Sequence, residues 1–249
     1  MQLALPEQQS SPSDVLLQYY EMLFTRLGPQ GWWPARTRLE VILGAILTQN
    51  TNWNNAALAL KQLRGAGLLK LTRLRGVSLS ELEACVRPAG FCRQKARTIR
   101  AFLDFLFEKS SSSLARLLNQ PAEELRRDLL GIRGLGPETV DAILLYAGRK
   151  PYFVADAYTR RILSRHGLIT QSADYAATQQ FLHRHLPGDE SLYNEFHALL
   201  VEIGKQFCRR NEALCGGCPL KEFLPQNQQE SRGEPATAAG ALQSALLPA

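Results

Sequence analysis

The sequence predicts an all-α protein. Apolar residues recur at helical spacing in nearly every segment, and no segment alternates apolar and polar residues over the length of a strand. Short connections that carry Gly, Pro or Asn separate these segments. The chain has 249 residues, of which 45% are hydrophobic, so we expect one or two domains with a substantial core.

The helices of the first half are predicted from their apolar faces. Residues 15–27 have apolar side chains at helical spacing, and Ser13 or Asp14 is expected to cap this helix. Residues 39–47, LEVILGAIL, are apolar nearly all round, which predicts a buried central helix. The other helices predicted in this half are 56–63, 79–86 and the basic, amphipathic 94–106.

The second half is predicted to hold further helices. Pro121 and Pro137 stand at the start of two of them, where proline is favoured. The predicted helices are 113–118, 122–130, 137–147, 158–165, 176–185 and 192–207. From residue 226 onward the chain is polar and poor in large apolar residues, which predicts a disordered tail over 226–249.

Composition and charge limit the classes of function. The chain carries 29 Lys and Arg against 23 Asp and Glu, a net charge of +6 that is compatible with a polyanionic partner. No segment is long and apolar enough to cross a bilayer, and the N-terminus has no basic region ahead of an apolar core. We therefore expect a cytoplasmic protein, associated with the nucleoid in a bacterium or archaeon, that does not bind membranes.

The stretch LLGIRGLGPETVDAILLYAGRKPYFVADAYTRRI, residues 129–162, contains a glycine turn between two predicted helices. Gly134 and Gly136 allow another backbone to come close, and the helix that begins at Pro137 presents free N–H groups and the positive end of its dipole. Such a turn can grip a phosphate without reading sequence, with Thr139 as a further contact. A simple packing corner between helices is the alternative.

A single carboxylate, Asp156, follows the hairpin after a short link and precedes the next helix. It can cap that helix, lie at the mouth of a DNA cleft, or do both. Basic residues on two segments are candidates for phosphate contact, although a charge run is more often a solvated helix face. These residues are Arg93, Lys95, Arg97 and Arg100 on the upstream segment and Arg160 and Arg161 after the carboxylate.

The order of hairpin, link and aspartate resembles the helix–hairpin–helix DNA glycosylase superfamily, in its endonuclease III branch, over residues 15–224. LTQNTNW, residues 47–53, is similar to that branch's loop after the buried helix. The resemblance implies a helical barrel over 31–148 that ends in the hairpin, and a second domain formed by 1–30 with 149–225. It also implies that Asp156 is the catalytic carboxylate and that Gln49 helps to fill the gap left by a flipped nucleotide.

Bifunctional members of this superfamily carry a lysine where this chain has Glu138. A carboxylate cannot form a Schiff base, so we expect a monofunctional glycosylase in which water is the nucleophile. Asp156 then stabilises the cationic sugar, activates the water, or both. Lys95 and Lys150 do not fall at the matching position, although a displaced lysine would restore AP lyase chemistry.

WWP…LGAILTQNT, with RPAGFCRQKA and FHALLVEIGKQFC, resembles a narrower group, the 3-methyladenine DNA glycosylases built on the endonuclease III fold. The resemblance implies a base pocket lined by Trp32, Trp33 and Trp53, with Lys205 nearby. Tryptophan faces attract a base that alkylation has made cationic, although buried anchors are the other meaning of these residues.

The predicted function is therefore removal of alkylated purines such as 3-methyladenine from double-stranded DNA. We expect a monomeric enzyme whose chemistry requires no cofactor. Two alternatives stay open: a bifunctional glycosylase and AP lyase acting on oxidised pyrimidines, and a non-catalytic binder of damaged DNA.

Three of the five cysteines, Cys208, Cys215 and Cys218, are close together in the sequence. Clustered cysteines suggest a metal before disulfides in a reducing compartment. In endonuclease III relatives a fourth cysteine completes the ligands of a [4Fe–4S] cluster, but this chain has Leu224 at that place. Three thiolates with an outside ligand would hold a labile cluster, whereas a decayed site would fold without metal; we expect decay or a partial site rather than a complete cluster.

Overall fold

The computed structural model describes residues 11–225, so the disordered tail predicted for 226–249 lies outside the described part. Within residues 11–225 the chain is helical, which confirms the all-α prediction, and its extended pairing is limited to an isolated bridge between Cys208 and Ala213. None of the helices described there is long and apolar enough to span a bilayer.

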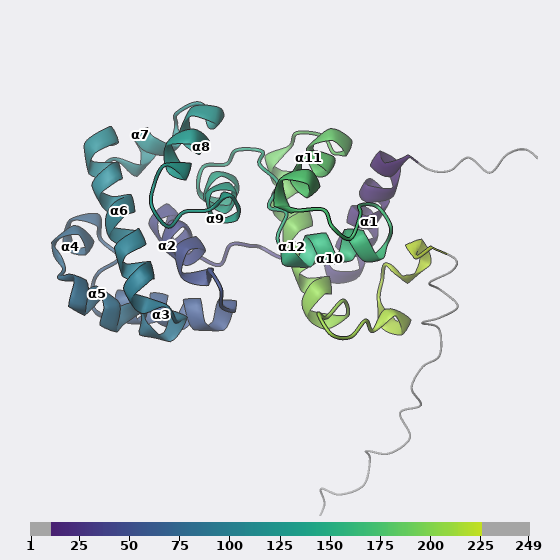
Figure 1. Ribbon diagram of the computed structural model, residues 1–249, viewed down its shortest axis with the longest axis horizontal. Coiled ribbons are helices and arrows are strands. Elements are labelled where there is room, and N and C mark those ends of the chain that lie inside the picture. Colours follow the sequence, from purple (N-terminus) through teal and green to yellow (C-terminus); the bar gives the residue numbers. More distant parts are fainter. Residues whose placement is uncertain (1–10, 226–249) are drawn as a thin grey trace, which may run out of the picture.

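One group of helices surrounds α2 and includes every helix from α2 to α9 (Figure 1). α2 is central because each residue from Leu39 to Leu47 is buried, as its all-round apolar sequence predicts. The helices of this group are α2 (Arg38–Thr48), α3 (Trp53–Gly65), α4 (Leu71–Gly76), α5 (Leu79–Val86), α6 (Cys92–Ser110), α7 (Leu114–Leu118), α8 (Ala122–Leu130) and α9 (Pro137–Ala142).

A second group brings the two ends of the described chain together (Figure 1). It contains α1 (Pro12–Leu27), α10 (Ala157–Arg165), α11 (Tyr175–His185) and α12 (Glu190–Gln206). α12 packs against both α10 and α1. Two non-helical connections, residues 28–37 and 148–156, join this group to the first.

The structure differs from the prediction at the start of α1 and at α4. α1 begins at Pro12 and its cap is Ser11, not Ser13 or Asp14 as predicted. The Ser11 hydroxyl accepts from the Asp14 N–H and the Asp14 carboxylate accepts from Ser11, which forms a reciprocal capping box. The six-residue α4 was not predicted, because it buries only one apolar side chain, Leu74.

The second helix of the hairpin was predicted to run as an α-helix to residue 147, but its α-helical part ends at Ala142. It changes at Ile143 to a π-helical turn, η2 (Ile143–Ala147), in which the Gly148 N–H donates to the Ile143 carbonyl over 3.0 Å. A π turn inserts an extra residue and so changes which side chains face a neighbouring helix. Here it brings Tyr146 against His197 of α12.

A buried carboxylate ties the hairpin helix to the second group. Asp141 of α9 is 0% exposed. It accepts two hydrogen bonds from Arg126 of α8, at 2.7 and 3.1 Å. Tyr175 and Gln179 of α11 also donate to it, at 2.9 and 2.8 Å. These contacts fix the position of α9 relative to α11, and therefore the geometry of the space between the two groups.

Candidate active site

A cavity of about 410 Å³ opens where the two groups of helices meet. Its wall combines the end of α2, the loop into α3, the start of α9, the N-terminus of α10 and one face of α12. The structure therefore brings together side chains that are far apart in the sequence. The sequence-predicted residues that line it are Trp32, Trp33, Gln49, Trp53, Glu138, Thr139, Asp156 and Lys205.

Three tryptophans form an aromatic wall in this cavity. The ring centroids of Trp32, Trp33 and Trp53 are 5.0–5.2 Å apart in every pair, with edge-to-face or tilted planes. Gly44 of α2 leaves room for this wall, because a Cβ there would lie 3.0 Å from Nε1 of Trp33. The wall offers both π faces and ring edges to a flat ligand.

Lys205, in the last turn of α12, lies at the edge of the aromatic wall. Its ammonium is 5.7 Å from the centroid of the Trp32 ring and 3.6 Å from a carboxylate oxygen of Glu202. The preceding residue, Gly204, leaves space for Tyr158, whose ring would overlap a Cβ at that position. The cavity lining therefore includes one amine, that of Lys205, which lies beside aromatic rings and forms an ion pair with Glu202.

Asp156 is at once the N-cap of α10 and a wall residue of the cavity. Its Oδ1 accepts from the Thr159 N–H over 2.8 Å, and its Oδ2 lies 3.6 Å from Nε2 of His197. Burial raises the pKa of Asp156, but His197 and the Thr159 hydrogen bond outweigh burial and hold the pKa below its usual value. The carboxylate is therefore ionised at neutral pH. Its side chain is 13% exposed and faces the cavity.

Glu138 lies at the rim of the cavity, in the first turn of α9. The protein around it and the nearby charge of Asp156 raise its pKa, while His197 and Arg160 oppose the rise. The residue keeps an exposed surface, so solvent screens these interactions. The side chain of residue 138, at the mouth of the cavity, is a carboxylate and not an amine.

The glycine hairpin is held close to α6 and to the end of α2. Gly134 has a φ of +94°, and a Cβ there would overlap the hydroxyl of Thr98 on α6, so both the backbone and the space require glycine. The Gln49 amide donates to the Gly134 carbonyl over 2.9 Å and to the Thr139 hydroxyl over 2.8 Å. The hydroxyl of Thr139 is therefore engaged inside the protein, and Gln49 braces the hairpin.

The basic residues predicted to contact phosphates have different environments. Arg93 is exposed on α6. Lys95, two residues later, is 2% exposed, and its ammonium donates to the carbonyls of Leu47 and Ala89 over 3.0 and 2.6 Å. This placement is inconsistent with the phosphate contact predicted for Lys95, because the side chain points into the core and caps the carboxyl end of α2.

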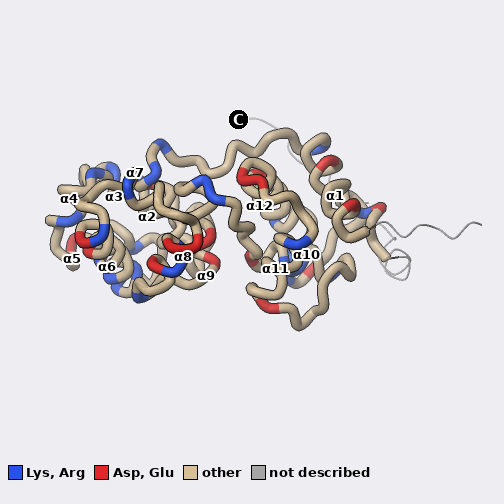
Figure 2. The backbone as a smooth tube through the Cα atoms, turned by 90° about the horizontal axis from the view of Figure 1, so that it is seen from above, with Lys and Arg blue, Asp and Glu red and all other residues tan. Residues whose placement is uncertain are grey.

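On α10 the arginines line a separate recess of about 280 Å³ (Figure 2 shows the basic residues on this helix). The Nε of Arg160 is buried without a hydrogen-bond partner in the described part of the chain. The Nε of Arg161 donates to the carbonyl of Cys208 over 2.6 Å. The Arg161 side chain therefore holds the C-terminal loop, whereas the Nε of Arg160 is free to bind another group.

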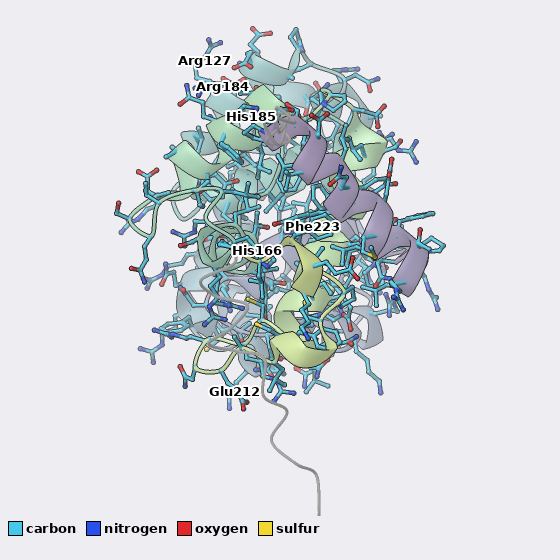
Figure 3. The ribbon with its side chains drawn as sticks, turned by 90° about the vertical axis from the view of Figure 1, so that its right-hand side faces the viewer. Arg127, His166, Arg184, His185, Glu212 and Phe223 are labelled. Carbon is cyan, nitrogen blue, oxygen red and sulfur yellow. The ribbon has the colours of Figure 1, made fainter. Side chains whose placement is uncertain are left out.

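The cysteine loop lies against α10 at the end of the molecule that Figure 3 presents, beside His166 and Phe223. Arg165 secures it by donating to the carbonyls of Arg209 and Arg210 over 2.8 and 3.0 Å. The ring of Tyr19 from α1 packs between Phe223 and His166, with centroids 4.9 and 5.3 Å away.

The donor set of this loop does not fit a four-cysteine cluster. Cys208, Cys215 and Cys218 line a shared cavity of about 20 Å³, enough for about one water molecule. Leu224, 5% exposed, also lines it. In the metal-free loop, burial raises the pKa of Cys218 to about 11. Within residues 11–225 no group of three or more side chains is arranged to hold a metal ion.

Sequence reasoning missed two residues behind Asp156. His197 is 6% exposed, and its Nδ1 is hydrogen-bonded to the hydroxyl of Tyr146. His197, Val201 and Lys205 are spaced by four residues, so they share the face of α12 that lines the cavity. That spacing from Lys205 was the signal available for His197, whereas nothing in the sequence indicated the π turn that places Tyr146.

Comparison with known proteins identifies a family. A sequence profile described as the HhH-GPD superfamily of base excision DNA repair proteins matches residues 43–187. A proposed DNA repair glycosylase of Methanocaldococcus jannaschii is 42% identical over 212 residues, which cover 84% of this chain and 96% of that protein. Endonuclease III of Sulfolobus acidocaldarius is 25% identical over 189 residues, 76% of this chain and 82% of the relative.

Solved structures are similar over most of the chain. A 3-methyladenine DNA glycosylase of H. pylori, bound to 1,N6-ethenoadenine, has a TM-score of 0.68 and 28% identity, and the match covers 79% of this chain and 98% of that one. An endonuclease III in a non-covalent complex with DNA has a TM-score of 0.75 and 20% identity, with 90% and 100% coverage. The fold is that of endonuclease III.

Proposed function

Because the chain belongs to the HhH-GPD superfamily of base excision DNA repair proteins, we propose that it removes alkylated purines such as 3-methyladenine from double-stranded DNA. It is a DNA glycosylase of that superfamily. The enzyme acts in the cytoplasm as a monomer, flips the damaged nucleotide into the cavity between the two helix groups, and hydrolyses its N-glycosidic bond.

One observation carries this proposal: an ionised carboxylate, Asp156, faces a cavity walled by three tryptophans. Departure of a base leaves positive charge on the sugar, and a fixed negative charge nearby stabilises that transition state. The Thr159 N–H is bonded to Oδ1, and Oδ2 has two lone pairs, of which one can face the sugar or the attacking water. Asp156 is the catalytic residue of the proposed reaction.

The aromatic wall recognises the base. Stacking on an aromatic ring contributes about 1–3 kcal/mol per base, and attraction of a cationic base to a tryptophan face adds about 0.5–2 kcal/mol. The ammonium of Lys205, near Trp32, opposes a cationic base but not a neutral one. We therefore include neutral alkylated adenines, such as the ethenoadenine bound to the H. pylori relative, among the substrates.

The absence of an amine at position 138 supports a monofunctional reaction with water as the nucleophile. Glu138 cannot form a Schiff base, and the ammonium of Lys95 is buried against two carbonyls. One observation favours the bifunctional alternative: Lys205 lines the same cavity as Asp156. Attack by that amine would give a covalent adduct with DNA that borohydride reduction traps.

DNA is gripped by the hairpin and by arginines, without reading sequence. The first N–H groups of α9 lack partners within the helix and attract a phosphate. The exposed Arg93 and the half-buried Arg160, whose Nε has no partner in the described part of the chain, add positive charge. Because neutralised phosphates release counterions, binding should weaken steeply as salt rises.

The proposed chemistry needs no metal, and we propose that the cysteine loop folds without an iron–sulfur cluster. Hydrogen bonds from Arg161 and Arg165 to loop carbonyls support this proposal, since they attach the loop to α10 directly.

The test is base release from duplex DNA that holds one 3-methyladenine, ethenoadenine or thymine glycol, with borohydride added in a parallel reaction. We expect release of the two purines, no strand cleavage and no trapped adduct. Cleavage at thymine glycol with a trapped adduct would instead establish the bifunctional alternative. Tight binding of every duplex with no base release would establish the non-catalytic binder.

A further inference from the structure

A chain of three polar side chains, the buried His197 between the half-buried Tyr146 and Asp156, runs from behind the aromatic wall to the cavity. The hydroxyl of Tyr146 is hydrogen-bonded to Nδ1 of His197, and Nε2 of His197 lies 3.6 Å from Oδ2 of Asp156. Nε2 is buried and has no hydrogen-bond partner in the described part of the chain. A separation just beyond hydrogen-bond distance is common in substrate-free active sites and shortens when substrate is bound.

The carboxylate that faces Nε2 of His197 favours one direction for the first hydrogen bond, in which the Tyr146 hydroxyl donates to Nδ1. Burial raises the pKa of Tyr146 well above its usual value, and the charges of Asp156 and Glu195 raise it further. The phenol therefore keeps its proton and has an O–H to donate. A neutral imidazole carries one proton, so if Tyr146 donates to Nδ1, that proton is on Nε2 and faces Asp156.

We propose that Tyr146 and His197 are positioning residues for Asp156: Tyr146 fixes His197 as the neutral Nε2–H tautomer, and that N–H holds Oδ2 of the carboxylate. This inference rests on the proposed function of the cavity. A neutral donor orients the carboxylate without cancelling its charge, which the cationic sugar requires. The opposite tautomer would aim a lone pair at Oδ2, and a cationic imidazole would form an ion pair that removes much of the useful negative charge.

Titratable groups from four elements surround His197. Asp156 faces it from α10, Tyr146 from η2 and Glu138 from α9, while Glu195 lies two residues before it on α12. The pKa of Asp156 is held low, so the group that faces Nε2 of His197 is a negatively charged carboxylate at neutral pH.

Three variants test the kinetic consequence. Tyr146→Phe keeps the ring that packs 5.2 Å from Trp33 and removes only the hydroxyl. His197→Gln replaces the imidazole with an amide that keeps an N–H donor. The control is Tyr193→Phe, because Tyr193 is also buried, on the same helix as His197, but lies outside the cavity lining.

In single-turnover excision we expect Tyr146→Phe to slow base release about tenfold at neutral pH, which corresponds to the net contribution of about one hydrogen bond. DNA affinity and the Tyr193→Phe rate should stay at the wild-type value. A double variant with both Tyr146→Phe and His197→Gln should be no slower than His197→Gln alone, because both changes act through the same contact with Asp156. Additive losses would overturn the proposal.

A spectroscopic measurement separates this inference from the proposed function. The chain has four histidines, so the ¹⁵N imidazole signals of His197 can be assigned by comparison with His197→Gln. We expect the Nε2–H tautomer in the wild type and a mixture in Tyr146→Phe. An Nδ1–H tautomer in the wild type overturns the inference even if the enzyme is active. The expected tautomers in a protein that releases no base would support the arrangement and refute only the proposed reaction.

Discussion

Asp156→Asn is the substitution that best separates chemistry from folding. Asn and Asp are comparable N-caps, so the amide oxygen of Asn can accept the Thr159 N–H as Oδ1 does at 2.8 Å. We expect the free energy of unfolding to change by less than about 0.5 kcal/mol. In a protein of this size that shifts Tm by about 2 °C or less. Asp156→Ala, in contrast, loses the cap and about 1 kcal/mol.

The catalytic loss can be worked out from the environment of the carboxylate. Because Asp156 is 13% exposed, an effective dielectric constant near 20 applies instead of that of water. A unit charge about 4 Å from a developing sugar cation then contributes about 4 kcal/mol. At 1.36 kcal/mol for each factor of ten, Asp156→Asn should release base about 10³-fold more slowly.

The assay is single-turnover release of 3-methyladenine or ethenoadenine from a duplex, with enzyme in excess so that product release does not limit the rate. Asp174→Asn is the matched control, because Asp174 caps α11 by accepting from the Ala177 N–H over 2.8 Å, away from the cavity lining. An Asp156→Asn rate above a tenth of wild type would refute the electrostatic reasoning. So would an equal loss in the control.

Three further predictions concern the pocket, the core and the cysteine loop. Lys205→Met removes the ammonium near Trp32 and should raise release of cationic 3-methyladenine relative to neutral ethenoadenine. We expect the ratio of the two rates to change only about threefold, because solvent screens the exposed charge. An unchanged ratio would contradict this. Asp141→Ala leaves Arg126 unpaired and should lower the free energy of unfolding by about 3 kcal/mol, as measured by urea denaturation; a loss below about 1 kcal/mol would show that the carboxylate does not hold α9 in place. Cys218→Ser should melt within a few degrees of wild type, and neither protein should absorb visible light; bound iron in the wild type that the variant loses would disprove a metal-free loop.

Much of the fold followed from local sequence. The all-round apolar run at residues 39–47 became the buried α2 because a helix without a polar face is stable only when it is surrounded. The predicted bounds of α5 and α8 match the structure, since Ser78 and Pro121 mark their starts. Tertiary contacts decided the shorter and irregular elements, α4 and the π turn at Ile143.

The basic segment on α6 shows the limit of sequence reasoning about a surface. Arg93 and Lys95 differ by two positions, which on a helix places them on different faces. Arg93 is exposed, whereas the ammonium of Lys95 replaces solvent with the carbonyls of Leu47 and Ala89. A charge count cannot distinguish these cases, because both residues contribute equally to the basic patch.

The sequence by itself determined the types of chemistry that this protein contains: a glycine hairpin, one carboxylate at a helix start, paired tryptophans and a glutamate where an amine would form a Schiff base. These features are local, because caps, turns and residue identity depend on a few neighbours in the chain. Only the tertiary structure decided which side chains share a cavity. The contact of Tyr146 and His197 behind Asp156 depends on a π turn in one helix group meeting α12 of the other. Packing between segments distant in sequence sets such contacts, and no local pattern encodes them.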